Sequence, residues 1–318
     1  MTILGNATAT ESAPRPPESR APDPSTGQPA ADPRPAGPTP PQPARHVLTS
    51  TEFDIIWERL GLGPTPVVLR LESPGRTWSE RNRIVADGWR ALRERGLAGP
   101  DGADPELARL LRLLAGPAVA LELRGWWGRS VRAVAAGTPD AGALAVRQDG
   151  TLTVQACGSL PGALLGVLPP TNPGPGQATT LRSGTLAAAL RATGGPAASG
   201  PAPIDSGAEA RLRVALTARA VPAADAGLLA HMLGGTERRA QLVALAGDRW
   251  GGTSRVGGVL TVLDGAAGRS LLTRSRGEDG VEWTTVAPTD DRRLRHRLGE
   301  LLAEAQPGEV MPGSALPA

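Results

Sequence analysis

The sequence predicts an α+β protein with a central antiparallel β-sheet and two helical bundles, and three observations support this class. Apolar stripes at helical spacing are followed by runs of strands in which apolar and polar residues alternate. Short hairpin turns, rather than helical crossovers, join those strands, which favours α+β over α/β. The order strand, helices, antiparallel strands, helix then occurs a second time. We therefore expect quasi-two-fold internal symmetry.

Both ends of the chain have the composition of disordered tails. Residues 1–45 contain twelve prolines, no aromatic residue and no periodic apolar pattern. Such a segment cannot bury enough apolar surface to offset the entropy of ordering it. Residues 306–318 have a similar composition. We expect ordered structure to begin at Thr49.

The first half of the expected domain, residues 48–170, begins with helices. Thr49 and Glu52 have the spacing of a capping box, and an apolar stripe runs from there to Gly61. The same reasoning predicts a strand at 66–71 and helices at 77–96 and 104–116. Strands are expected at 119–124, 131–136, 144–146 and 152–154, the last two around the hairpin signal Asp149-Gly150, followed by a short helix at 159–168.

The second half, residues 177–305, repeats this order after a Pro- and Gly-rich linker at 172–176. A strand at 177–181 and a helix at 185–192 precede a break at 194–207. Helices are then expected at 208–220 and 223–233, and strands at 241–246, 258–263, 270–273 and 281–286. Asp264-Gly265 and Asp279-Gly280 are turn signals between strands. A final helix carries Leu294, Leu298, Leu301 and Leu302 on one face, with Asp290 and Asp291 suited to its positive end.

The composition argues against an enzyme. The chain has no Lys and no Tyr, so all 34 basic residues are Arg, and lysine-dependent and phenol-dependent chemistries are excluded. His46, His231 and His296 lie far apart and have no ligand spacing to one another or to Cys157. We interpret Cys157 as a small core residue. No catalytic constellation, metal site or cofactor fingerprint is found, so we expect none of these.

The charge balance and hydropathy point to a soluble cytoplasmic protein. The formal net charge is only +3, which does not indicate a polycation built for nucleic acid. A single cysteine fits a reducing compartment. The N-terminus does not resemble a signal peptide, and no apolar run is long enough to span a bilayer, so we expect no membrane insertion.

Arginine-rich helices leave two interpretations open. Residues 90–95 and 292–297 carry clustered arginines on helices whose other positions hold an apolar stripe. The simpler interpretation is a solvated helix face with acids nearby. The alternative is a regulator that binds nucleic acid or another protein through these helices, although no interleaved aromatic residues support the nucleic-acid version.

Trp126 and Trp127 stand side by side at the end of a strand, where alternation sends the two rings to opposite faces. One ring can enter the core, and the other is left near the surface. Since an exposed tryptophan is a frequent anchor of protein interfaces, this position is a candidate contact site. Shielding of the ring by neighbouring arginine stems is the alternative.

Several segments together resemble the EspG family, which is associated with ESX (type VII) secretion in actinobacteria. The resemblance runs from about Leu48 to Leu302. It is carried by EFDIIWERLGLG at 52–63, SPGRT at 73–77, VALELRGW at 119–126, PPTNPGPG at 169–176 and WTTVAP at 283–288. It implies a cytosolic, non-enzymatic chaperone with a central antiparallel sheet, two helical bundles and quasi-two-fold symmetry. Such a chaperone binds a PE–PPE heterodimer and covers the apolar helical tip of the PPE protein until export.

The resemblance also implies a partner surface made by the sheet, the C-terminal helical bundle and the loop between the second and third strands. That loop corresponds here to residues 127–130. From position and chemistry we expect Trp127 and Arg129 to contact the partner. A WXG-type or other ESX substrate remains an alternative to a PE–PPE-like pair, and the sequence does not indicate the oligomeric state.

Overall fold

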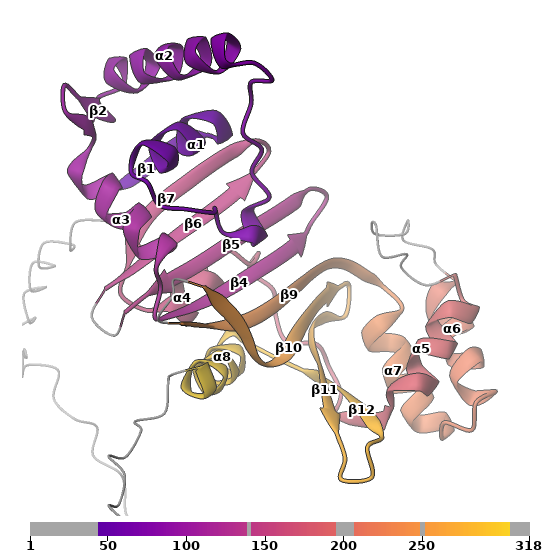
Figure 1. The fold of residues 1–318 in the computed structure, drawn as a ribbon. Helices are drawn as coiled ribbons and strands as arrows, with labels where there is room; N and C mark the ends of the chain where they lie inside the picture. The colour runs from indigo at the N-terminus through magenta and orange to yellow at the C-terminus, as the bar shows by residue number, and fades with distance from the viewer. Residues whose placement is uncertain (1–43, 139–140, 195–206, 249–251, 306–318) are drawn as a thin grey trace, which may run out of the picture. The chain divides into compact units, whose positions relative to one another are not determined.

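A ten-stranded antiparallel sheet is the centre of the fold (Figure 1). The computed structural model describes residues 44–138, 141–194, 207–248 and 252–305. All of them belong to the second of the two units into which the chain divides, Pro43–Ala318. The elements of the first half are β1 (Arg45–Thr49), α1 (Ser50–Arg59), the 3-10 helix η1 (Val67–Leu69), α2 (Trp78–Glu94), β2 (Ala98–Gly99), β3 (Gly102–Ala103), α3 (Pro105–Ala115), β4 (Val119–Trp126), β5 (Ser130–Gly137), β6 (Gly142–Gln148), β7 (Thr151–Cys157) and α4 (Leu160–Leu165).

The second half repeats the first. Its elements are β8 (Thr179–Arg182), α5 (Ser183–Ala192), α6 (Ala208–Thr217), α7 (Ala223–Leu233), β9 (Thr236–Gly247), β10 (Thr253–Gly265), β11 (Gly268–Arg276), β12 (Glu282–Pro288) and α8 (Asp291–Ala305). The strand order is β1-β7-β6-β5-β4-β9-β10-β11-β12-β8. Strands β4 and β9 meet at the centre, and each edge strand leads into the first helix of its own half. This mirrored order is the α+β, quasi-two-fold arrangement that the sequence predicts, whereas the exact limits of the halves, 48–170 and 177–305, stay a prediction.

Helices α1 to α4 and α8 begin where the sequence supplies a side-chain cap. The Thr49 hydroxyl accepts from the Glu52 backbone N–H at 3.1 Å, and the Glu52 carboxylate accepts from the Thr49 N–H at 2.7 Å, which completes the predicted capping box of α1. Asp104 caps α3 through the Leu107 N–H at 2.9 Å. Asp290 accepts from the N–H of Arg293 at 2.7 Å, at the start of α8.

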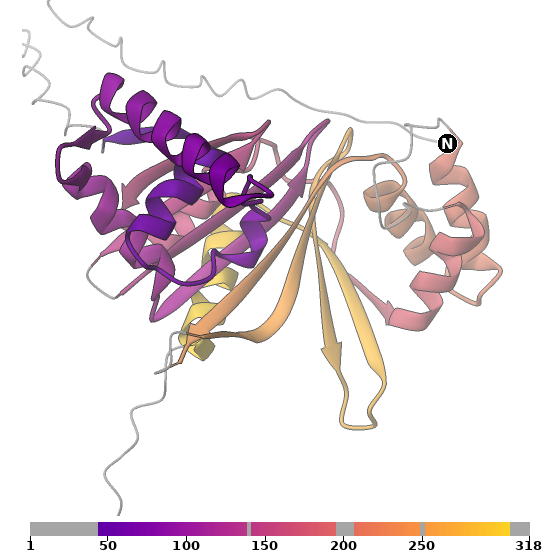
Figure 2. The ribbon, with the colours of Figure 1, turned by 45° about the horizontal axis from the view of Figure 1, so that its top comes forward.

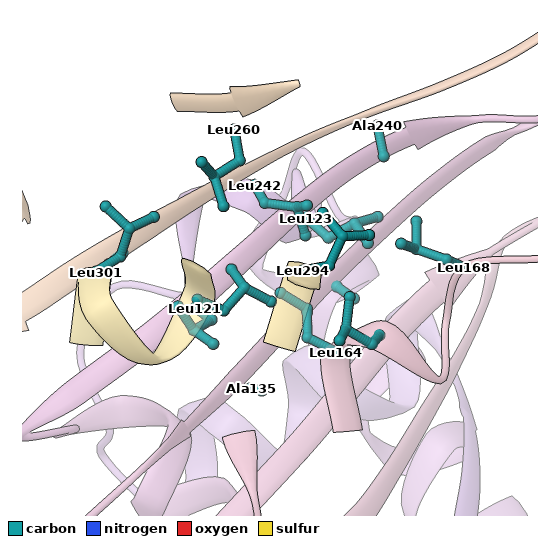
Figure 3. Packing of buried hydrophobic residues seen from close by; sticks show 14 of the residues in the cluster. Leu121, Leu123, Ala135, Leu164, Leu168, Ala240, Leu242, Leu260, Leu294 and Leu301 are labelled. Carbon is teal, nitrogen blue, oxygen red and sulfur yellow. The ribbon is translucent and has the colours of Figure 1, made fainter. Parts of the chain in front are cut away.

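One face of the sheet packs on α4 and α8. Leucines and alanines of β4, β5, β9 and β10 form a buried cluster there with the apolar stripes of the two helices (Figure 3). The predicted stripe of α8 is confirmed, because Leu294, Leu298 and Leu301 belong to this cluster and Leu302 packs against it. Each fully buried leucine contributes roughly 1.5–3 kcal/mol. This cluster therefore joins the two halves through their shared central strands.

The other face, which we call the bundle face, carries both helical bundles. Helices α1 and α3 form a second buried cluster with β1, β4, β5, β6 and β7. Helices α5, α6 and α7 form a third cluster with Leu181 of β8 and Val286 of β12. Figures 1 and 2 show these bundles at opposite ends of the sheet. The bundle face of the central strands β4 and β9 therefore lies between them.

A buried arginine attaches the segment between the halves to the second half. Arg269 is 1% exposed. Its guanidinium donates to both carboxylate oxygens of Asp264, at 2.8 and 2.9 Å, to Asp291 Oδ1 at 2.9 Å and to the Pro169 carbonyl at 2.6 Å. Its backbone N–H donates to the Asn172 carbonyl at 2.8 Å. Residues 169–172 are thereby fixed against the β10–β11 hairpin and the start of α8.

The structure corrects four expectations. The predicted strand at 66–71 is wrong, because Val67–Leu69 forms a 3-10 turn that ends in a left-handed residue, Arg70, with φ 46°. Regular structure is already present before Thr49, since β1 starts at Arg45 and pairs with β7. His46, which precedes the expected start at Thr49, therefore lies in a strand and is buried. The turn expected at Asp264-Gly265 follows these residues, which still belong to β10. The tails predicted at 1–45 and 306–318 otherwise lie outside the described residues.

Candidate functional site

The turn between β4 and β5 contains both residues that the sequence singles out. Trp127, Gly128 and Arg129 connect the strands after the pair Trp126 and Ser130. The backbone N–H of Trp127 donates to the Arg129 carbonyl at 3.1 Å, and Gly128 has φ 80°, a left-handed conformation that glycine adopts without strain. The turn is therefore a short, defined connection that presents two different side chains.

Trp127 and Trp126 lie on opposite faces of the sheet, as strand alternation predicts. The Trp127 ring is half-buried against the cluster formed with α4 and α8. It lies over Gly125, because a Cβ atom at Gly125 would stand only 2.1 Å from Trp127 Cζ3. Trp126 shares the bundle face with Ala120, and its Nε1 is buried with no hydrogen-bond partner among the described residues. Trp127 therefore combines packing with partial exposure.

Arg129 is exposed and links two neighbouring turns. Its Nη1 donates to Asp149 Oδ2 at 3.0 Å, in the turn between β6 and β7, and both side chains are more than half exposed. With its amide oxygen turned toward Arg129, Gln148 accepts from Nε and Nη2 of that arginine, each at 2.8 Å. An exposed ion pair of this kind contributes about 0–1 kcal/mol. Arg129 therefore presents an exposed guanidinium, paired with Asp149 and Gln148, at this end of the sheet.

The bundle face of the central strands carries polar residues that the sequence analysis did not single out. A row of directly paired positions crosses the sheet from Leu48 under the first bundle to Val286 under the second. The positions between them include, in order across β6, β5, β4, β9 and β10, Arg147, Arg132, Arg124, Gln241 and Thr261. Only the strand register brings these residues together. The alternation in β4 predicts which residues share a face with Arg124, but no local sequence signal predicts that other arginines lie opposite it.

Next to this row, Glu122 of β4 is a buried carboxylate, 7% exposed. Desolvation raises the pKa of Glu122, and the charge of Arg124 opposes that shift. The nearest distance between the two side chains, from Arg124 Nη2 to Glu122 Oε2, is 3.8 Å, too long for a hydrogen bond. Glu122 therefore compensates the arginines only weakly.

The histidines and the cysteine do not form a site. His231 and His296 each lie 3.4 Å from a single glutamate, and His46 lies in β1, at the edge of the sheet. Within the described ranges, no three His, Cys, Asp or Glu side chains are placed to hold a metal ion. Burial raises the pKa of the Cys157 thiol, and this residue packs against the cluster under α4 and α8, which agrees with its interpretation as a core residue.

Several arginines of the two arginine-rich segments have acidic or carbonyl partners. Arg90 pairs with Asp87 at 2.8 Å, and Arg297 pairs with Glu300. Arg95 donates to both carboxylate oxygens of the buried Glu52, at 2.8 and 2.9 Å. These contacts favour the simpler interpretation of a solvated helix face over the nucleic-acid alternative. None of the described helices is both long enough and apolar enough to cross a membrane.

The fold defines a class of α+β proteins with one central antiparallel sheet and a helical bundle at each end. The chain belongs to the EspG family, whose model matches residues 49–300. Among solved structures it is similar to EspG5, the type VII secretion system chaperone of Mycobacterium tuberculosis, described in complex with the PE25–PPE41 dimer. The TM-score is 0.62 and the identity 16%, and the match covers 84% of this chain and 98% of that chain. No curated protein sequence matches this chain. At this identity, the likeness to EspG5 establishes the fold.

Proposed function

We propose that this protein is a chaperone of a type VII (ESX) secretion system that binds a helical export substrate and keeps it soluble. The observation that carries the proposal is the match to the EspG family over residues 49–300, nearly all of the described chain. The similar fold of EspG5, which the match covers almost completely, supports it. An apolar surface exposed before export favours self-association, and a bound chaperone removes that surface from water.

The substrate that we propose is a PE–PPE-like heterodimer. EspG5 is described in complex with such a pair, PE25–PPE41, and this chain shares its fold. We further propose that the protein has no enzymatic activity and acts in the cytoplasm, where a substrate waits before export. Membership of a chaperone family supports both statements. Neither a cofactor nor a nucleic acid is part of the proposal.

Within the partner surface, we propose contacts by Trp127 and Arg129. Both project from the β4–β5 turn, at the end of the central strands and beside the β6–β7 turn. The half-buried Trp127 ring offers a rigid apolar surface, and Arg129 offers a guanidinium that can exchange its pairing with Asp149 for a partner carboxylate. The proposed contact therefore combines an apolar surface from Trp127 with one positive charge from Arg129.

The proposal is tested by purifying the tagged protein from the cells that make it and identifying what stays bound by mass spectrometry. We expect a stoichiometric pair of helical proteins encoded with an ESX system. Recovery of a WXG-type protein in place of that pair would support the chaperone function but would identify a different substrate. Recovery of nucleic acid alone, together with a salt-sensitive gel shift, would instead favour the regulator that uses the arginine-rich helices.

A further inference from the structure

The strand register places three arginines directly opposite one another. Arg124 of β4 is paired with Arg132 of β5, which is paired with Arg147 of β6. We call these three residues the arginine row. Directly paired residues of antiparallel strands share a face, and the same row contains Leu48 of the second buried cluster. The arginine row therefore lies on the bundle face.

The charges of the arginine row oppose one another. Like charges directly opposite each other in a sheet are destabilising. Burial, and then the charges of neighbouring arginines, lower the pKa of Arg132; these neighbours are Arg70, Arg124 and Arg147. The carboxylate beside the row, Glu122, is itself buried and has a raised pKa. The row therefore carries an excess of positive charge.

Two of the three arginines have a structural role. Arg147 Nη1 donates to the carbonyl oxygens of Leu69 and Arg70, at 2.8 and 2.7 Å. Arg132 Nη1 lies 3.4 Å from the Val68 carbonyl. These contacts hold η1 over the sheet. They also fix the backbone of Arg70, whose side chain is exposed beside the row and whose φ of 46° is unusual for a residue other than glycine.

Among the described residues, the charges of the other two cations, Arg124 and Arg70, are poorly compensated. The side chain of Arg124 is 53% exposed and is 3.8 Å from the Glu122 carboxylate. Across the ranges that the structure describes, no hydrogen bond or ion pair joins the Arg70 side chain to another residue. Continuing across the sheet from Arg124, the row offers the Gln241 amide and the Thr261 hydroxyl. This combination of two guanidinium groups with neutral hydrogen-bonding groups is complementary to carboxylates.

We propose that the bundle face of the central strands binds an acidic segment of a partner protein, with Asp or Glu side chains of the partner contacting Arg70 and Arg124. This inference rests on the proposed function and adds a property of the export substrate: carboxylates on the segment that meets the chaperone. Charge-assisted contacts of guanidinium with carboxylate are strong and geometrically specific. Opposite charges across an interface also speed association and exclude partners of the wrong charge.

The absence of lysine from the chain allows a direct test. The substitutions R70K and R124K each introduce a single ε-amine, and a carbodiimide joins an amine only to a carboxylate in contact with it. R295K is the matched control, because Arg295 is exposed on α8 and α8 packs on the opposite face. We expect the protein pair that co-purifies with the unmodified chain to be cross-linked through its Asp or Glu residues to the first two variants and not to the third.

Charge reversal supplies the second measurement. R70E and R124E are expected to reduce affinity for the same co-purified pair by about tenfold or more, with a weaker effect at high salt, while R295E leaves affinity unchanged. Melting temperatures within the range of the control show that the variants are folded. Both residues are exposed, and the one contact with a buried group that is lost is the 3.8 Å approach of Arg124 to Glu122.

Three results would overturn the inference. Binding of the pair that survives both charge reversals, or a bound pair that gives no cross-link, would leave the proposed function intact and remove the acidic contact. A cross-link to carboxylates of residues 1–43 of the same chain, or binding of nucleic acid at this face, would assign it another occupant. If the unmodified chain retains no export substrate at all, the proposed function fails and this inference fails with it.

Discussion

Replacing Arg269 by Met should destabilise the protein strongly, because it leaves a buried carboxylate without its main partner. Asp264 is 3% exposed and receives two hydrogen bonds from Arg269, at 2.8 and 2.9 Å. After the substitution it keeps only the Thr171 hydroxyl at 3.1 Å and the more distant Arg238, whose Nε lies 3.8 Å away. Breaking a buried ion pair by removing one member costs about 3–5 kcal/mol.

The other contacts of Arg269 add smaller losses. Asp291 is 61% exposed, so the loss of its pairing with Arg269 costs less than about 1 kcal/mol after screening by solvent. The Pro169 carbonyl loses a hydrogen bond worth about 1 kcal/mol. We therefore expect the free energy of unfolding to fall by about 3–5 kcal/mol from the unpaired Asp264, with up to about 2 kcal/mol more from these two contacts.

Urea unfolding followed by tryptophan fluorescence measures this loss. The control Asp291→Asn should change stability by less than about 1 kcal/mol. The double variant Arg269→Met, Asp264→Leu should recover most of the loss, because an apolar pair removes the unpaired charge. A single variant R269M within 1 kcal/mol of the unmodified protein would refute the argument that the buried Asp264 carboxylate depends on Arg269 as its partner.

Three further predictions follow from individual side chains. Trp127→Ala should reduce the free energy of partner binding by more than it reduces the free energy of unfolding. Equal losses in the two free energies would make the ring purely structural. The raised pKa of Glu122 means that the folded unmodified protein binds more protons than the unfolded one, so it loses stability as pH rises from the ordinary glutamate pKa through the raised pKa. Glu122→Gln has no such group and should therefore become more stable relative to the unmodified protein over this pH range. Equal pH dependence of unfolding in both proteins would contradict this. Cys157, whose thiol pKa is raised by burial, should react with iodoacetamide at neutral pH much more slowly in the folded than in the unfolded protein.

The sequence predicted the elements whose signals are local. The capping box at Thr49 and the cap at Asp104 define helix starts through side chains within three positions of the cap, and both are observed. The Asp149-Gly150 signal likewise marks the hairpin between β6 and β7. The repeat of the element order can be recognised from the local signals of each half, without knowing which strands pair. The strand order of the sheet shows the same repeat.

The errors concern elements that depend on distant residues. Strand β1 is only five residues long and follows a Pro-rich segment, and its partner β7 lies about a hundred residues later in the chain. The apolar run Val67–Leu69 has the composition of a strand, yet its carbonyls accept from Arg132 and Arg147 instead of from a neighbouring strand. Propensity alone cannot distinguish these outcomes, because tertiary contacts decide them.

In the candidate site, too, some features follow from local sequence and others depend on distant residues. The placement of the adjacent tryptophans on opposite faces follows from alternation within one strand. The packing of Trp127 over Gly125, two residues earlier, could also have been suspected, since a glycine inside a strand often marks close approach of another group. The arginine row could not have been predicted from the sequence, because it depends on the register of β4, β5 and β6.

The proposed chaperone function is tested most directly by producing the co-purified substrate pair with and without this protein and comparing the two samples by size-exclusion chromatography. We predict that the pair alone is aggregated, and that with this protein it elutes as one soluble complex containing this protein and both members of the pair. A pair that is soluble by itself, or that stays aggregated while this protein elutes alone, would contradict the account.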